Sequence, residues 1–193
     1  MSTNNSFLDY KYTQPSDNFV RVPIAPRIIQ NHSYNDTFYL TLYRLSRPTP
    51  KERYLDKDYY PYAQLARFTE LSLQQVKRQL EICADLNLII ETADKIILPP
   101  LIDQDVVRLR KDLVDKLLQY HTPQLITIYA YLYEHRDPEP VSTVDLTNAF
   151  GYTQMVSKTK FFRSTVEQLY MDHHIALRFV RQDRPWTIMS TPL

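Results

Sequence analysis

Four polar side chains near the start of one predicted helix could make directed hydrogen bonds to a planar partner. They are Gln74, Gln75, Lys77 and Arg78. Val76, Leu80 and Cys83 recur at i, i+4 and i+7 and mark the buried stripe of this helix. The two glutamines and the arginine fall on the opposite face, and the lysine lies at its edge. Because glutamine and arginine can each form two hydrogen bonds with a base edge, this face predicts base contacts in DNA. The alternative is an ordinary solvated helix surface.

Six further basic residues lie on a later predicted helix and hairpin and are suited to binding phosphate. They are Lys158, Lys160, Arg163, Arg178, Arg181 and Arg184. These side chains supply charge without a fixed base register, so we expect them, together with Lys77, to contact phosphates of a nucleic acid. The alternative is that they are scattered charges that keep the protein in solution.

The chain has no pattern typical of a catalytic or metal site. His173 and His174 are adjacent, and neighbouring helical residues point about 100° apart, so the two cannot easily ligate one ion. Cys83 and His121 have no ligand spacing with them. No serine lies in a nucleophile-elbow context. Gly151 is the only glycine, which excludes a glycine loop that cradles phosphate. We therefore expect no catalytic residue, no metal, no cofactor and no enzymatic activity.

Three helices and a hairpin are predicted to position the first polar set. The first helix covers residues 38–45, with Asn35 or Asp36 as its cap. Pro61 suits the first turn of the second helix. Ser72 can cap the third helix, because its hydroxyl can accept a hydrogen bond from a backbone N–H. Two apolar strands with a polar turn between them follow at residues 86–90 and 96–98.

The C-terminal part of the chain repeats this pattern. Residues 125–132 resemble the first helix. Phe162, Val166 and Leu169 match the buried stripe of the polar helix, and a hairpin is predicted between residues 176 and 189. Two copies of one unit in one chain indicate an internal duplication.

The order helix, turn, polar helix and hairpin resembles the winged helix-turn-helix superfamily. The tandem arrangement, and a strand at residues 19–23 before the first helix, are similar to plasmid replication initiators and phage replication proteins. Transcriptional regulators use the same unit. The resemblance implies an α+β, helix-dominated fold that binds double-stranded DNA sequence-specifically, in transcription regulation or in plasmid or phage replication initiation. Winged helices also bind proteins, so a protein–protein interaction module that does not bind DNA is the alternative.

Four parts of the chain follow from this pattern. They are a flexible N-terminal arm (1–18), a first winged-helix unit (19–100), a connecting or dimerisation helix (101–120) and a second winged-helix unit (121–193). The third part keeps a helical period over residues 103–120. Its apolar residues are Val106, Leu109, Leu113, Val114, Leu117 and Leu118. We expect this helix either to connect the two units or to hold a homodimer together.

The composition is that of an ordinary globular protein. Of the 193 residues, 44% are hydrophobic and 23% are charged, and the net charge is +1. Any basic surface must therefore be local. Cys83 is the only cysteine and cannot form an internal disulfide, which fits a reducing cytosol. The chain shows no signal peptide and no apolar run of membrane-spanning length. We therefore expect a cytoplasmic protein without membrane contact.

Overall fold

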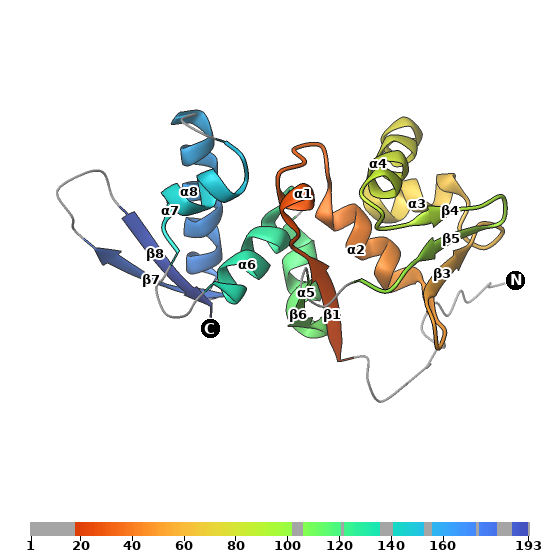
Figure 1. Cartoon of the computed structure of the whole chain (residues 1–193), viewed down its shortest axis with the longest axis horizontal. Coiled ribbons are helices and arrows are strands. Elements are labelled where there is room, and N and C mark those ends of the chain that lie inside the picture. Colours follow the sequence, from red (N-terminus) through yellow and green to blue (C-terminus); the bar gives the residue numbers. More distant parts are fainter. Residues whose placement is uncertain are drawn as a thin grey trace, which may run out of the picture.

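The chain forms an elongated α+β molecule (Figure 1). The computed structural model describes residues 18–101, 106–120, 122–135, 141–152, 156–172, 174–180 and 187–192. One group of helices with a small sheet forms one end, a second group with a hairpin forms the other, and a two-stranded sheet lies between them. Up to residue 17, the predicted N-terminal arm lies outside the described residues.

The first group follows the predicted order of three helices and a hairpin. Its elements are α2 (Asp36–Leu45), β2 (Arg47–Pro48), β3 (Arg53–Asp56), α3 (Tyr62–Thr69), α4 (Leu73–Asp85), β4 (Ile90–Glu91) and β5 (Lys95–Leu98). The strands form one antiparallel sheet in the order β2-β3-β5-β4. Leu55 of β3 lies opposite Ile96 of β5, and both are buried, so this face of the sheet packs on the core. Strand β4 is shorter than predicted because Asn87 adopts a left-handed turn conformation (φ 56°).

The second group repeats this order of helices and hairpin. Its elements are α6 (Leu125–Glu134), α7 (Thr143–Ala149), α8 (Val156–Met171), β7 (Ile175–Val180) and β8 (Thr187–Pro192). Strands β7 and β8 pair antiparallel along their whole length. Phe162, Val166 and Leu169 of α8 are all buried, as the helical period predicts.

The prediction of one continuous helix over residues 103–120 is wrong. Residues 106–110 form strand β6 (Val106–Arg110), and only α5 (Lys111–Leu117) and a 3₁₀ turn (Leu118–Tyr120) are helical. Strand β6 pairs with β1 (Phe19–Pro23), which precedes the short helix α1 (Pro26–Ile29). Val107 and Leu109 are buried at a period of two, whereas Val106 and Leu109 fit a helical period. The apolar residues are therefore compatible with both structures, and pairing with the distant strand β1 selects the strand. The long helix that would carry the predicted homodimer is therefore absent from residues 106–120.

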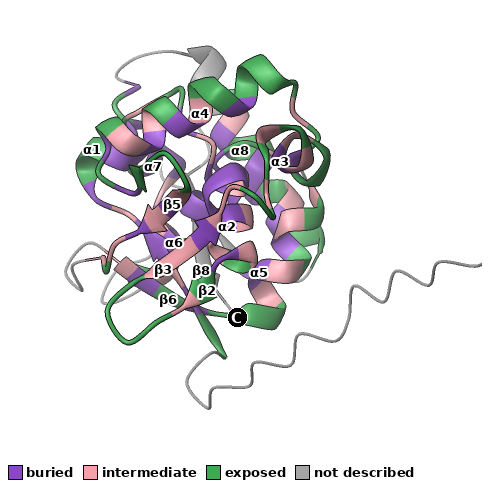
Figure 2. Cartoon of the chain, turned by 90° about the vertical axis from the view of Figure 1, so that its right-hand side faces the viewer, coloured by how far each residue is buried: buried purple, intermediate pink, exposed green. Residues whose placement is uncertain are grey.

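A single hydrophobic core runs through both groups of helices. Figure 2 shows its buried residues gathered on α2 and α6 at the centre of the molecule. Fully buried aromatic rings come from both groups, for example Phe38 and Tyr39 of α2 and Tyr129 of α6. None of the described helices is both long and apolar enough to cross a membrane.

Candidate nucleic-acid interface

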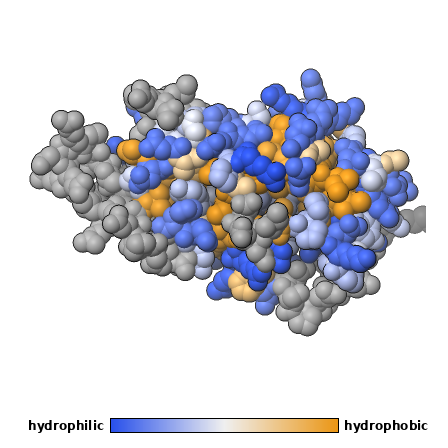
Figure 3. Space-filling view, viewed as in Figure 1, coloured by the Kyte–Doolittle hydropathy of each residue, from blue (hydrophilic) through white to orange (hydrophobic). Residues whose placement is uncertain are grey.

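Helix α4 presents the first predicted polar set to solvent. Its apolar stripe of Val76, Leu80 and Cys83 is buried against the core. Gln74, Gln75, Lys77 and Arg78 are all exposed. Figure 3 shows hydrophilic residues along the upper edge of this end of the molecule, with hydrophobic residues exposed beside them. The structure therefore brings the four predicted residues together on the exposed face of one helix.

A capping box fixes the start of α4. The Gln75 N–H donates to Ser72 Oγ at 3.2 Å, and the Ser72 N–H donates to Gln75 Oε1 at 2.8 Å. The predicted N-cap is confirmed, but Gln75 has a structural role that the sequence analysis did not assign. Its amide oxygen is engaged in the cap, whereas Gln74, Lys77 and Arg78 form no hydrogen bond or ion pair with the described part of the chain. Those three side chains and the amide nitrogen of Gln75 are therefore left available for a ligand.

We expect Ser72→Ala to lower the free energy of unfolding by about 1 kcal/mol, because the Gln75 N–H in the first turn loses its acceptor. Urea unfolding followed by circular dichroism measures this difference. Ser164→Ala is the matched control, since Ser164 is exposed within α8 and caps nothing. That control should leave stability unchanged or raise it, because alanine favours helix. Equal losses in both variants would contradict the capping role.

Gln79 joins α4 to the segment that precedes α2, and the sequence analysis did not single it out. Its Nε2 donates to the carbonyl oxygen of Ser33 at 2.8 Å, and its Oε1 accepts the N–H of Asn35 at 3.1 Å. Both ends of one amide thus bind backbone groups two residues apart. Gln79 lies between the buried stripe and the exposed face of α4, so the sequence pattern does not predict this contact.

The first hairpin is anchored through Glu91. Lys57 Nζ lies 2.8 Å from the Glu91 carboxylate, and the Tyr62 hydroxyl donates to the same group. Partial burial would raise the pKa of the Glu91 carboxyl, but hydrogen bonds from Lys57 and Tyr62 outweigh it and lower that pKa. The ammonium of Lys95 lies 5.1 Å from the centre of the Tyr54 ring. The base of the hairpin is therefore held by Lys57 and Tyr62, and Lys95 lies over a ring of the neighbouring strand β3.

The second predicted set is placed only in part. Lys160 and Arg163 of α8 are exposed, and Arg163 Nε donates to Glu167 at 2.8 Å. Lys158 belongs to α8 and Arg178 to β7, but their side chains lie outside the described residues. Arg181 and Arg184 lie outside the described residues altogether. Figure 1 shows α4 and the N-terminal end of α8 on the same side of the molecule.

Asp36 links the two groups of helices. Asn35 caps α2 by accepting the Phe38 N–H at 3.1 Å, which leaves the Asp36 carboxylate for α6. Its oxygens accept the Gln124 N–H at 3.1 Å, the Thr127 N–H at 2.9 Å and the Thr127 hydroxyl at 3.1 Å. Helix α6 has no side-chain cap of its own, so Asp36 supplies one from a distant part of the chain. Burial raises the pKa of Asp36 and outweighs the hydrogen bonds, which lower it.

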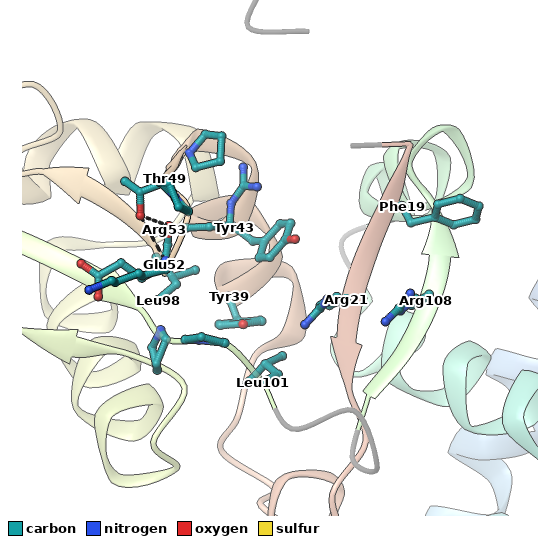
Figure 4. Close-up of a pocket in the computed structure, with 15 residues that line it drawn as sticks. Phe19, Arg21, Tyr39, Tyr43, Thr49, Glu52, Arg53, Leu98, Leu101 and Arg108 are labelled. Carbon is teal, nitrogen blue, oxygen red and sulfur yellow. Dashed lines mark hydrogen bonds between the residues drawn. The ribbon is translucent and has the colours of Figure 1, made fainter. Parts of the chain in front are cut away.

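A separate groove of about 430 Å³ lies between the β1–β6 sheet and the loop before β3 (Figure 4). Arg21 and Arg108 lie opposite each other on neighbouring strands at its edge. Its other charged lining residues are Lys51, Glu52 and Arg53. Four basic groups and one carboxylate suit an anion rather than acid–base catalysis. In the described part of the chain, no three His, Cys, Asp or Glu residues are grouped to hold a metal ion.

Comparison with family models, characterised proteins and solved structures finds no match to this chain.

Proposed function

We propose that this chain is a tandem winged helix-turn-helix protein that binds double-stranded DNA sequence-specifically. Transcription regulation and plasmid or phage replication initiation are the two settings that such a protein fits. The observation that carries the proposal is the exposed face of α4, where Gln74, Lys77 and Arg78 project from the first turns without partners in the described chain. Side chains of these types on such a helix are suited to the major groove.

The arrangement around α4 supports this interpretation. A three-residue turn joins α3 to α4, and the β4–β5 hairpin follows α4 and pairs with β3. This is the order of elements in a winged helix-turn-helix, in which the second helix of the pair enters the groove. The second group repeats the order, and its helix α8 begins on the same side as α4 (Figure 1).

The types of polar side chain support different roles for α4 and α8. Gln74 and Arg78 suit base edges, whereas Lys160 and Arg163 suit phosphates. A net charge of +1 gives little general attraction to DNA, so recognition would depend on this one surface.

A winged-helix module that binds another protein is the second candidate. The first hairpin favours it, because Glu91 and Asp94 are exposed where a DNA-binding wing usually carries basic residues. Such a module would bind no duplex at any salt concentration.

We expect Arg78→Ala to reduce discrimination between a selected duplex and a random one by about 1–3 kcal/mol, because a bidentate base contact is lost. Lys160→Ala should instead weaken binding to every duplex and reduce the salt slope by about one unit. Fluorescence anisotropy at several salt concentrations measures both effects. Lys116→Ala, an exposed lysine of α5 outside the proposed interface, is the control and should bind as wild type does. Absence of saturable binding by wild type at low salt would overturn the DNA function.

Gln75→Glu separates the capping role of this residue from base recognition. A glutamate at the same position keeps the capping box, so the free energy of unfolding should change by less than about 0.5 kcal/mol. The new negative charge and the lost amide donor should weaken DNA binding at least about 10-fold. Unchanged affinity in this variant would place Gln75 outside the interface.

A further inference from the structure

The groove between the β1–β6 sheet and the loop before β3 gathers positive charge on two facing walls (Figure 4). Arg21 and Arg108 come from the sheet, Lys51 and Arg53 come from the loop and the start of β3, and Glu52 is the one carboxylate among the described lining residues. The lining therefore carries four positive charges and one negative charge, whereas the whole chain has a net charge of only +1. Such a local excess of positive charge attracts a ligand with several negative charges.

The two arginines of the sheet form the first half of the site. Arg21 lies directly opposite Arg108 in the antiparallel register, so both side chains share one face of the sheet. Val20 and Val22 point to the other face and are buried, which leaves the arginine face toward the groove (Figure 4). Like charges at directly opposed positions repel each other. An anion between them would relieve this repulsion, and each guanidinium can donate two parallel hydrogen bonds to one phosphate.

Arg53 fixes a positive charge on the facing wall. Its Nε donates to Ser46 Oγ at 2.9 Å, and its Nη2 donates to the Ser46 carbonyl oxygen at 3.0 Å. The guanidinium carbon also lies 4.4 Å from the centre of the Tyr43 ring. Because these contacts already hold the side chain in one position, little conformational entropy would be lost when an anion binds beside it.

The loop between β2 and β3 is held in a fixed shape. The Thr49 N–H and hydroxyl both donate to the Glu52 carbonyl oxygen at 2.7 Å, and the Thr49 hydroxyl oxygen accepts the Glu52 N–H at 3.1 Å. Pro48 and Pro50 restrict the backbone on either side of Thr49. The side chain of Lys51 is exposed and forms no hydrogen bond or ion pair with the described part of the chain. The loop therefore presents an ammonium group from a pre-formed wall.

The groove is larger than a single phosphate group needs. Its volume of about 430 Å³ lies in the range of small-molecule pockets, which is about 300–1,000 Å³. One phosphate bound at the arginine pair would fill only a small part of this volume, and the charges of the facing wall would remain for further phosphates. Tyr43, Pro99 and Leu101 add apolar surface to the lining, which suits the organic part of a ligand.

We propose that this groove binds the di- or triphosphate group of a small molecule. One phosphate is held between Arg21 and Arg108, and the following phosphates extend toward Lys51 and Arg53. Nucleoside polyphosphates and inorganic polyphosphates both carry this group. The inference is independent of the proposed DNA function, because the β1–β6 sheet and the β2–β3 loop lie on the side of the molecule away from α4 in both Figure 1 and Figure 2.

Isothermal titration calorimetry of the full chain tests the site with tripolyphosphate, ATP and orthophosphate. The titrations use about 150 mM salt, which screens attraction between distant charges, and no divalent cation. Tripolyphosphate and ATP should each bind at one site per chain and at least about 10-fold more tightly than orthophosphate, because they reach both walls. Tighter binding of ATP than of tripolyphosphate would identify a nucleotide as the source of the group, and equal or weaker binding would identify inorganic polyphosphate. Binding of neither polyphosphate, or equal binding of orthophosphate, would overturn the proposal.

Variants separate this site from general attraction between opposite charges. Arg108→Ala should weaken tripolyphosphate binding at least about 10-fold. Glu52→Gln should strengthen it about 2- to 5-fold, because it removes a repelling carboxylate, and a misfolded variant could not produce such a gain. Arg110→Ala is the matched control, since it removes the same charge two residues along β6, but Arg110 pairs with Asp112 and does not line the groove. Equal losses in Arg108→Ala and Arg110→Ala would overturn the site.

A competition measurement distinguishes the small molecule from the phosphate backbone of DNA. Because the groove faces away from α4, a saturating duplex should not displace tripolyphosphate, and Arg108→Ala should bind duplex as wild type does. Displacement of tripolyphosphate by a random duplex, together with weaker duplex binding in Arg108→Ala, would assign the groove to the DNA backbone and overturn the small-molecule ligand. If wild type bound no duplex at all, the proposed DNA function would fail, and the tripolyphosphate titration would still decide what the groove binds.

Discussion

Replacing Asp36 by alanine is expected to lower the free energy of unfolding by about 3 kcal/mol or more. The Gln124 and Thr127 N–H groups and the Thr127 hydroxyl would lose their acceptor in a buried position, and each unsatisfied buried donor costs about 1–3 kcal/mol. Urea unfolding followed by circular dichroism gives the difference. Asp112→Ala is the control, because Asp112 is exposed and forms its ion pair with the exposed Arg110. Equal losses in the two variants would show that Asp36 does not cap α6.

The stability that Asp36 contributes should also depend on pH. Burial raises its pKa in the folded protein above the value in the unfolded chain, so the folded state binds this proton more tightly. The contribution is therefore largest below the ordinary aspartate range and falls as pH rises through the raised pKa. Comparison with Asp36→Asn, which does not titrate, isolates this effect. The advantage of wild type over this variant should shrink with rising pH, and an advantage that grows with pH would mean that the hydrogen bonds outweigh burial.

Replacing Phe162 by alanine is expected to destabilise the whole chain rather than its C-terminal part alone. Removing a fully buried phenylalanine costs about 3–5 kcal/mol, and Leu80→Ala in the other half should cost about 2–5 kcal/mol. Because one core joins both groups of helices, each variant should shift a single unfolding transition. Hydrogen exchange of backbone amides should show lower protection in α4 and in α8 together.

Leu73→Ala provides the control for these core variants. Leu73 is 51% exposed at the start of α4, so its loss should change stability by only about 0.5 kcal/mol. If Phe162→Ala and Leu80→Ala each produced two transitions, the halves would unfold independently. The continuous core would then not join the two groups of helices into one cooperative unit.

The local features of the first unit were determined by the sequence itself. Ser72 as N-cap, the buried stripe of Val76, Leu80 and Cys83, and the hairpin after α4 follow from short-range rules of capping, helical period and turn composition. The same rules located Phe162, Val166 and Leu169 in the second unit. Such signals depend on residues within a few positions of each other, so they can be recognised without knowledge of the rest of the fold.

Only the tertiary structure decided the features that depend on distant partners. Residues 106–110 became a strand because β1 lies beside them, although their apolar residues also fit a helix. Gln79 and Asp36 acquired their roles from backbone groups 44 to 91 residues away. Gln75 looked like a base-reading residue, yet its amide oxygen is engaged in the capping box. From the sequence one can infer only that a buried polar side chain needs a hydrogen-bond partner. The fold determines which partner lies within reach.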